Sequence, residues 1–331
     1  MKKVTAIVCH HKGDLILKAI KSLQAQKRVE IEIIVATSVP NASFYGVRTL
    51  YIQGGPAYKR NIAFRYATNP LIAFFDDDIE AYPNAVYEMA KALEINDDCG
   101  MVFGKLLKMD NITRLDEAGS FLTPSGFLWA RAESNKIDTG EFSKVEHVLS
   151  GKSAACMIRR EVFTKIGMFD ASYEILGEET DLAWRVWLSG HTVLFVPQSK
   201  TLHAFDTKFK PKDFYIPRRV YYNGCRNYLT MLYTNLGRKR WIIPIMSQLT
   251  IWTVAALGMA VTGKFEAAKN IFMGLGYFIR NIWNIWKKRY NVQRNLRKIS
   301  DKELMQTIMK NPGIRYYLVR FWRYISLGLH G

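Results

Sequence analysis

Three consecutive aspartates, Asp76, Asp77 and Asp78, are the residues whose type and spacing most clearly suggest chemistry in this sequence. They follow an apolar run over residues 71–75 that is typical of a buried strand. Adjacent carboxylates repel one another, and a shared cation removes that cost. Hard oxygen ligands suit Mg²⁺ or Mn²⁺, which commonly join carboxylates to substrate phosphates. A second interpretation stays open, in which the triplet is a solvated acidic turn before the next helix.

A second group of carboxylates, Glu178, Glu179 and Asp181, opens a helix that we expect over residues 179–189, with Gly190 as its C-cap. Carboxylates in a first turn are favoured by the helix dipole, so simple N-terminal capping is one explanation. The other explanation is general-base catalysis, because a carboxylate can accept the proton of an attacking hydroxyl group.

The elements that must position these carboxylates alternate between strands and helices. We expect strands at residues 4–9, 32–36, 49–52, 71–75, 100–106 and 193–197, and helices after Asp14, at residues 59–68 and at residues 83–95. Residues 54–56 (Gly-Gly-Pro) read as a turn. This alternation predicts an α/β fold in which helices cover both faces of a mainly parallel sheet. Ligands bind beyond the carboxyl ends of such strands, where the aspartate triplet lies.

The charge of the chain is unevenly distributed. The 331 residues carry a net charge of +18, and residues 204–331 account for all of it, with 23 basic and 5 acidic side chains. Residues 1–203 are balanced, with 24 of each sign. A protein coated uniformly with nucleic acid would not divide in this way, so we expect an anionic partner for the C-terminal part alone.

The cysteines and the N-terminus indicate a reducing compartment. Cys9, Cys99, Cys156 and Cys225 are far apart and lack C-x-x-C spacing, which predicts reduced thiols. The strand-like run at residues 4–8 is too short for a signal peptide. We therefore expect the catalytic part to lie in the cytoplasm.

Two apolar stretches, residues 241–262 and 271–286, mark the C-terminal part. The first is uncharged and long enough to span a bilayer, but its polar residues leave three alternatives: a buried core helix, a membrane span, or a helix lying in the membrane interface. The second ends in Trp283 and Trp286 beside the basic residues 287–289, which is typical of a helix at headgroup level. The basic residues before 241 (Lys208, Lys210, Lys212, Arg218, Arg219, Arg238, Lys239 and Arg240) and the aromatic stretch 316–329 fit the same interpretation.

Taken in order, these segments resemble a family 2 glycosyltransferase with the GT-A fold, in its rhamnosyltransferase-like branch. The resemblance covers about residues 1–230 and includes residues 4–8, 22–26, 59–61, 71–78, 150–160, 166–170, 178–185, 196–197 and 203. The ordered series is far more specific than any one of its motifs.

The resemblance implies a GT-A, Rossmann-like catalytic domain at residues 1–205, with nucleotide-sugar binding at about 1–100 and the acceptor part at about 101–205. Residues 206–331 would then form a basic, helical, membrane-associating extension. The implied activity is inverting transfer of a hexosyl or deoxyhexosyl group from a nucleotide-sugar donor to a hydroxyl of a glycan or lipid-linked acceptor. The implied location is the cytoplasmic face of the cell membrane, with an anionic membrane surface as partner and no nucleic acid.

The resemblance also assigns roles. Glu179 would be the catalytic base, with Glu178 and Asp181 orienting the acceptor and nearby loops. Mn²⁺ or Mg²⁺ would be held by Asp78 and Asp76, with His203 either as a third ligand or as a structural hydrogen-bonding residue. The implied donor-binding residues are Asp76, Asp77, His10, Thr37, Arg60, Asn61 and Arg226.

The sequence departs from the family pattern at two places. Relatives usually carry an acidic residue after the second strand, where this chain has Thr37, which can hydrogen-bond but brings no charge. The loop His10-His11-Lys12 also differs, and it is either an exposed loop or a contact to the donor. For Arg226, an ordinary basic surface is the alternative to a diphosphate contact.

Two other classes of protein remain as alternatives at this stage. A metal-dependent phosphohydrolase or nucleotidyltransferase would also use the aspartate triplet, but it gives no reason for Glu179. A non-catalytic protein that binds an anionic ligand such as nucleic acid would use basic residues interleaved with aromatics. The balanced, acidic-edged N-terminal part argues against a polyanion.

Overall fold

The computed structural model describes residues 1–132, 136–204, 218–237 and 240–319. Apolar segments that alternate with helices form one central sheet. The main strands, in their order across the sheet, are β3 (Arg48–Tyr51), β2 (Val29–Thr37), β1 (Lys2–His10), β4 (Leu71–Asp76), β11 (Ala155–Arg159), β6 (Cys99–Lys108), β12 (Thr192–His203) and β10 (Glu146–His147). β3, β2, β1 and β4 are parallel, and β6 and β12 are parallel to each other. β11 and β10 run antiparallel to their neighbours.

Two short strands extend this sheet, and two more form a hairpin of their own. β5 (Ile79–Ala81) pairs with β12, and β7 (Leu115–Glu117) pairs with β6. β8 (Ser120–Leu122) and β9 (Leu128–Ala130) form a separate hairpin. The expectation of a mostly parallel sheet flanked by helices is confirmed.

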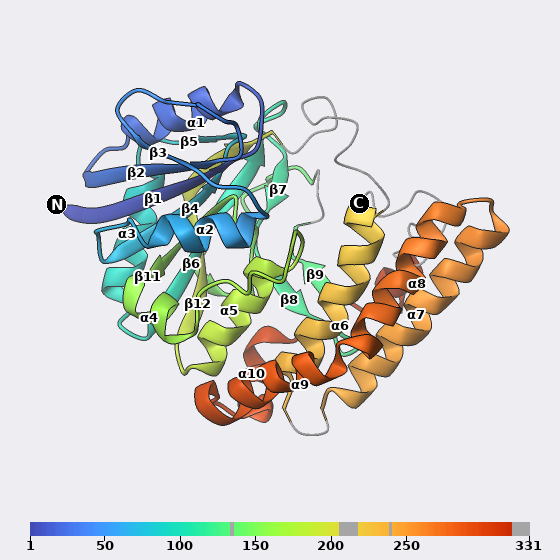
Figure 1. The fold of residues 1–331 in the computed structure, drawn as a ribbon. Helices are drawn as coiled ribbons and strands as arrows, with labels where there is room; N and C mark the ends of the chain where they lie inside the picture. The colour runs from blue at the N-terminus through green and yellow to red at the C-terminus, as the bar shows by residue number, and fades with distance from the viewer. Residues whose placement is uncertain (133–135, 205–217, 238–239, 320–331) are drawn as a thin grey trace.

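Helices cover both faces of the sheet (Figure 1). α1 (Leu15–Gln24) and α3 (Ala85–Ile95) contribute to one hydrophobic core, and α2 (Pro56–Phe64), α4 (Arg160–Lys165) and α5 (Glu178–Leu188) contribute to the other. In the second core the ring of Phe163 lies 4.9 Å from Phe64, 5.3 Å from Phe74 and 5.5 Å from Phe169. These rings join α2, β4 and α4 directly beneath the strand ends that carry the predicted site.

The C-terminal part is helical. Its elements are η2 (Arg218–Tyr222), α6 (Asn223–Asn235), α7 (Ile242–Val261), α8 (Phe265–Arg280), α9 (Ile282–Asn291), η3 (Val292–Leu296) and α10 (Asp301–Ile308). Residues of α6 to α10 belong to the same hydrophobic core as α2, α4 and α5. In Figure 1, α7 and α8 form a hairpin on the side of the molecule away from strands β1 to β3.

Some basic side chains of the C-terminal part donate hydrogen bonds to the last backbone carbonyls of α6. The side chains of Arg289 and Arg297 donate to backbone carbonyls at residues 233, 235 and 236, and Gln293 donates to those at 234 and 235. The last carbonyls of a helix have no partner within the helix and carry its negative dipole end, so cations placed there are stabilising. Part of the positive charge in this region is therefore used within the protein.

Several boundaries differ from the sequence-based expectation; for example, the helix expected at residues 59–68 ends at Phe64. Pro56 is not in a turn but is the first residue of α2, because a proline needs no backbone hydrogen bond at that position. The apolar stretch 271–286 is divided between α8 and α9, with Asn281 between them. Residues 208, 210, 212, 238, 239 and 320–329, and the side chains of Arg218 and Arg219, lie outside the part that the structure describes.

Candidate active site

The carboxyl ends of three adjacent parallel strands bring the first site residues together. His10 at the end of β1 is in register with Thr37 at the end of β2, and Cys9 is in register with Asp76 at the end of β4. Since parallel strands end at the same edge of a sheet, His10, Thr37 and Asp76 share one rim, as the sequence predicts.

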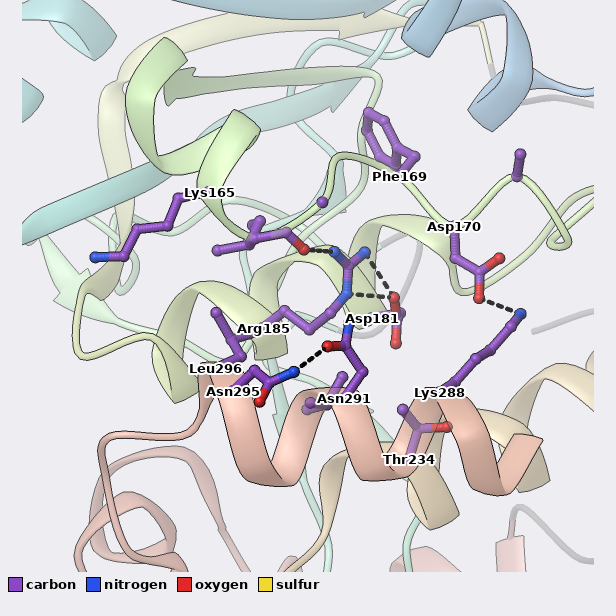
Figure 2. A pocket seen from close by; sticks show the side chains of 14 residues that line it. Lys165, Phe169, Asp170, Asp181, Arg185, Thr234, Lys288, Asn291, Asn295 and Leu296 are labelled. Carbon is purple, nitrogen blue, oxygen red and sulfur yellow. Dashed lines mark hydrogen bonds and ion pairs between the residues drawn. The ribbon is translucent and has the colours of Figure 1, made fainter. Parts of the chain in front are cut away.

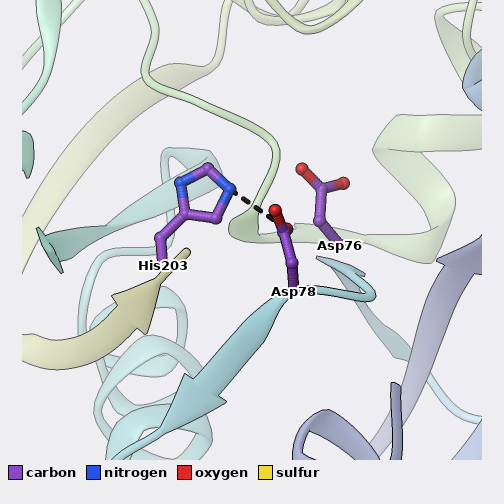
Figure 3. A group of neighbouring side chains, drawn as sticks. All are labelled: Asp76, Asp78 and His203. Carbon is purple, nitrogen blue, oxygen red and sulfur yellow. Dashed lines mark ion pairs between the residues drawn. The ribbon is translucent and has the colours of Figure 1, made fainter. Parts of the chain in front are cut away.

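Asp76, Asp78 and His203 form a cluster in which one ligand atom from each side chain lies within 4.8 Å of the others (Figure 3). His203 is the last residue of β12, and the backbone N–H of Ala204 donates to the carbonyl of Asp78 at 2.9 Å. The His203 Nε2 atom lies 3.2 Å from Asp78 Oδ1. Two carboxylates and one imidazole nitrogen are a suitable ligand set for a divalent cation, so the residues present fit the predicted metal.

Asp116 supports this cluster from behind and was missed by the sequence analysis. Its Oδ2 lies 2.8 Å from His203 Nδ1, and its Oδ1 accepts a hydrogen bond from Lys152 Nζ at 2.7 Å. Burial alone would lower the pKa of His203, but Asp78 and Asp116 outweigh it and raise that pKa to about 9. Burial likewise opposes ionisation of Asp116, while Lys152 and His203 hold its pKa well below the usual range.

An imidazole whose second nitrogen faces a carboxylate is a frequent arrangement at metal sites. It fixes the ring orientation and leaves the other nitrogen, here Nε2, directed at the cluster. The only signal in the sequence was the acidic pair Asp116-Glu117, which lay in a region whose pattern we could not interpret.

The middle aspartate of the triplet points elsewhere. Asp77 Oδ2 accepts a hydrogen bond from the backbone N–H of His11 at 2.9 Å. Burial raises the pKa of Asp77 to about 7; the His11 hydrogen bond opposes this rise, and the charges of Asp78 and Asp76 reinforce it. Asp77 therefore fixes the loop after β1 rather than joining the metal cluster.

Arg60 connects the aspartates to the second predicted group of carboxylates. Its guanidinium donates to Asp76 Oδ1 at 2.8 Å and to Glu178 Oε1 at 3.5 Å, and its side chain is 1% exposed. Burial alone would lower the pKa of Arg60, but Cys9, Asp76 and Glu178 raise it above its ordinary value. One buried cation thus lies between carboxylates that are 102 residues apart in the chain.

Glu178 and Glu179 form the first turn of α5, beside the metal cluster. Burial raises the pKa of Glu178, with Arg60 opposing the rise. Burial and the adjacent Glu178 raise the pKa of Glu179 well above its usual value, which makes its carboxylate a stronger base. Gly177, which precedes the helix, has φ of 89°, a left-handed conformation that favours glycine.

Asp181 lies on the opposite side of α5, within the protein. Its Oδ2 accepts from Arg185 Nε at 2.8 Å, and its Oδ1 accepts from Asn235 Nδ2 at 2.9 Å. Arg185 also donates to the carbonyls of Ile166 and Met168, both at 2.7 Å. These bonds join α5 to α6 and to the loop after α4, so Asp181 is engaged in holding α5 in place.

His10 and Thr37 contact each other at the carboxyl ends of β1 and β2. His10 Nδ1 lies 2.8 Å from Thr37 Oγ1, and His10 Nε2 lies 3.2 Å from the carbonyl of Gly13. Burial lowers the pKa of His10, which keeps its ring neutral at physiological pH. Lys59, not singled out for a role from the sequence, donates from Nζ to the carbonyl of His10 at 2.7 Å.

Asn61 and Arg226 bind backbone groups of the chain itself. Asn61 exchanges two hydrogen bonds with the backbone of Phe169, at 2.8 and 3.1 Å. Arg226 donates to the carbonyl of Ser172, and its guanidinium lies 4.6 Å from the ring centre of Tyr277. Both side chains contact the segment that leads into α5.

The sequence matches two profiles of known protein families and one characterised protein. The profile for Glycosyl transferase family 2 matches residues 5–167, and that for Glycosyl transferase family group 2 matches residues 142–286. O-antigen biosynthesis protein RfbC of Myxococcus xanthus is 28% identical over 150 residues, which are 43% of this chain and 12% of that protein. Together the two profiles span residues 5–286, and the chain belongs to family 2 of the glycosyltransferases.

One of two similar solved structures shares the fold. GalNAc-T7, crystallised with UDP, GalNAc and Mn²⁺, has a TM-score of 0.60 at 14% identity over 96% of this chain and 58% of its own. Mannosyltransferase PcManGT from Pyrobaculum calidifontis, in complex with GDP-Man and Mn²⁺, has a TM-score of 0.49 at 16% identity over 87% and 84% of the two chains. The first of these likenesses confirms the GT-A fold.

The contact between Asp116 and His203 leads to a prediction about metal affinity. We expect Asp116→Asn to weaken Mn²⁺ binding by about 10- to 100-fold, because the neutral amide no longer fixes and polarises the imidazole. Titration calorimetry with Mn²⁺ and a nucleoside diphosphate measures this change. Asp138→Asn is the matched control, since Asp138 also pairs with a lysine, Lys105 at 2.8 Å. Equal losses in both variants would contradict the assignment.

Proposed function

We propose that the protein is an inverting glycosyltransferase that uses a nucleotide-sugar donor and Mn²⁺ or Mg²⁺. It moves a hexosyl or deoxyhexosyl group to a hydroxyl of a glycan or lipid-linked acceptor. The observation that carries this proposal is the position of Arg60 between Asp76 and Glu178, since it brings the metal cluster and the first turn of α5 into one site. The similarity to an O-antigen biosynthesis protein supports a glycan acceptor.

In this proposal Asp76, Asp78 and His203 hold the metal. The bound ion would offset the negative charge that develops on the departing nucleoside diphosphate. GalNAc-T7, which shares the fold, was crystallised with Mn²⁺, so Mn²⁺ is the first ion to test. His10, Thr37 and Asp77 line the donor side, where the strand ends meet.

Glu179 is the proposed base. It would accept the proton of the acceptor hydroxyl as that oxygen attacks the anomeric carbon from the side opposite the diphosphate. A raised pKa suits this task, because a carboxylate with a higher pKa takes a proton more readily. Arg60 and Glu178 keep the carboxylate beside the metal cluster, while Asp181 and Asn61 act at a distance by holding α5 and the Phe169 backbone.

This assignment predicts a large loss of turnover in Glu179→Gln. We expect kcat to fall by about 10²- to 10⁴-fold, because the amide cannot accept the proton, while nucleoside diphosphate and Mn²⁺ still bind. The wild-type kcat should rise with pH until Glu179 is deprotonated. The assay is release of nucleoside diphosphate from a series of nucleotide sugars with an acceptor extract.

Glu161→Gln is the control for this variant, because Glu161 is an exposed carboxylate in the first turn of α4. Asp78→Asn should lose both turnover and metal-dependent nucleotide binding. Turnover in Glu179→Gln equal to that of Glu161→Gln would refute the role of Glu179. Hydrolysis of the nucleotide without sugar transfer to any acceptor would favour a phosphohydrolase instead.

We also propose that the C-terminal part rests on an anionic membrane surface. α7 is the one helix within the described residues that is long and apolar enough to cross a membrane. One of its faces packs on the protein, with Trp252, Ala256 and Met259 buried. The opposite face exposes a row of uncharged residues, in which Ile243, Met246, Val254, Leu257 and Val261 are 41 to 88% exposed.

A helix lying in the membrane interface explains this arrangement better than a span. If α7 crossed the membrane, it would lose the contacts of its buried face with the rest of the protein. These include the hydrogen bond of 3.3 Å from Gln248 to the carbonyl of Ser125. On α8, Phe265 and Ile279 are also exposed, at 69% and 68%. Residues 240–298 contain ten basic side chains and one acidic side chain, which suits anionic lipid headgroups.

The membrane proposal predicts the behaviour of a double variant. We expect Leu257→Asn with Val261→Asn to reduce binding to vesicles that contain an anionic phospholipid by about tenfold or more, because two exposed apolar side chains no longer enter the lipid. Co-sedimentation measures the bound fraction. Ile95→Asn, which replaces a 69% exposed residue on α3, should bind as the wild type does. Equal binding by all three proteins would contradict this surface.

A further inference from the structure

The segment of residues 170–176, which we call the α5 entry loop, leads directly into Glu178 and Glu179. Its neighbours include side chains from the C-terminal helices. Lys288 on α9 donates from Nζ to Asp170 Oδ2 at 2.6 Å (Figure 2). It also donates to Ser172 Oγ at 2.7 Å. The backbone N–H of Ser172 in turn donates to Asp170 Oδ1 at 2.9 Å. One lysine thus fixes the beginning of the entry loop.

Asn227 on α6 fixes the end of the same loop. Its Nδ2 donates to the carbonyls of Ile175 at 2.9 Å and Leu176 at 2.8 Å. Leu176 has φ of 72°, and Gly177 follows with φ of 89°. A left-handed leucine is strained, and such a conformation persists only where its surroundings hold it. Asn227 supplies that support one turn before the proposed base.

A pocket of about 410 Å³ lies between the beginning of the entry loop and α9 (Figure 2). Lys165, Asp170 and Arg185 line one of its sides, and Lys288 and Asn291 of α9 line another. The packing between the entry loop and α9 is therefore incomplete, and Lys288 bridges the two with its hydrogen bonds to Asp170 and Ser172. Removing them should loosen the loop without opening the hydrophobic core.

We propose that Lys288 and Asn227 are positioning residues of the transferase: they hold the entry loop so that Glu179 presents its carboxylate to the acceptor. The inference rests on the proposed role of Glu179 as base. It makes the C-terminal helices part of the catalytic unit as well as a membrane contact. Neither residue touches the reacting atoms, so each acts through the loop.

The first test compares Lys288→Met with Lys302→Met, which replaces an exposed lysine on α10. We expect Lys288→Met to lower kcat about tenfold while the KM for the donor changes less than about twofold, because the metal and donor residues are untouched. The acidic limb of its kcat profile should move to lower pH, because a looser loop exposes Glu179 to water. Lys288→Arg should restore most of the rate, and Lys302→Met should match the wild type.

Hydrogen exchange gives a readout that needs no turnover. Amides of residues 171–179 should exchange faster in Lys288→Met, and in Asn227→Asp, than in the wild type or Lys302→Met. Unchanged exchange together with unchanged kcat in Lys288→Met would overturn the positioning role. If the wild type transfers no sugar from any donor, the proposed function fails instead, and the exchange data still decide whether α9 and α6 hold the loop.

Discussion

The organisation of the site depends on one buried cation. Arg60 is almost completely removed from solvent and lies between Asp76 and Glu178. A buried guanidinium without carboxylate partners is very costly, and so is a buried carboxylate without a cation. The fold therefore has to bring the end of β4 to the first turn of α5. The Rossmann-like half and the segment after β11 meet at that contact.

This constraint explains why so many polar and charged side chains around the site bind the protein itself. Asp181, Asn61 and Asn227 all hold either α5 or the chain before it. Asp116 does the same for His203 on the opposite side of the metal cluster. A base and a metal site that come from different parts of the chain need such support, because small displacements are costly in catalysis.

The sequence predicted the fold class and the places of the main strands, because apolar periodicity is a local signal. It could not predict that Asp77 turns toward the His11 backbone, or that Asp116 supports His203, because these contacts join segments far apart in the chain. The sequence also could not predict which side of α7 is buried, because its 20 residues are uncharged throughout. Only the packing distinguishes the buried Trp252 from the exposed Leu257. Branch and sugar specificity remain proposals for the same reason, since they depend on loops without periodicity.

The most direct test of the account is a crystal structure with Mn²⁺ and a nucleoside diphosphate, using the anomalous signal of manganese. We expect one ion, at about 2.2 Å from carboxylate and imidazole atoms of Asp76, Asp78 and His203, with the diphosphate as its other ligand and the Glu179 carboxylate facing the sugar position. An ion bound elsewhere, or a nucleotide that occupies the pocket between Asp170 and α9, would contradict this expectation.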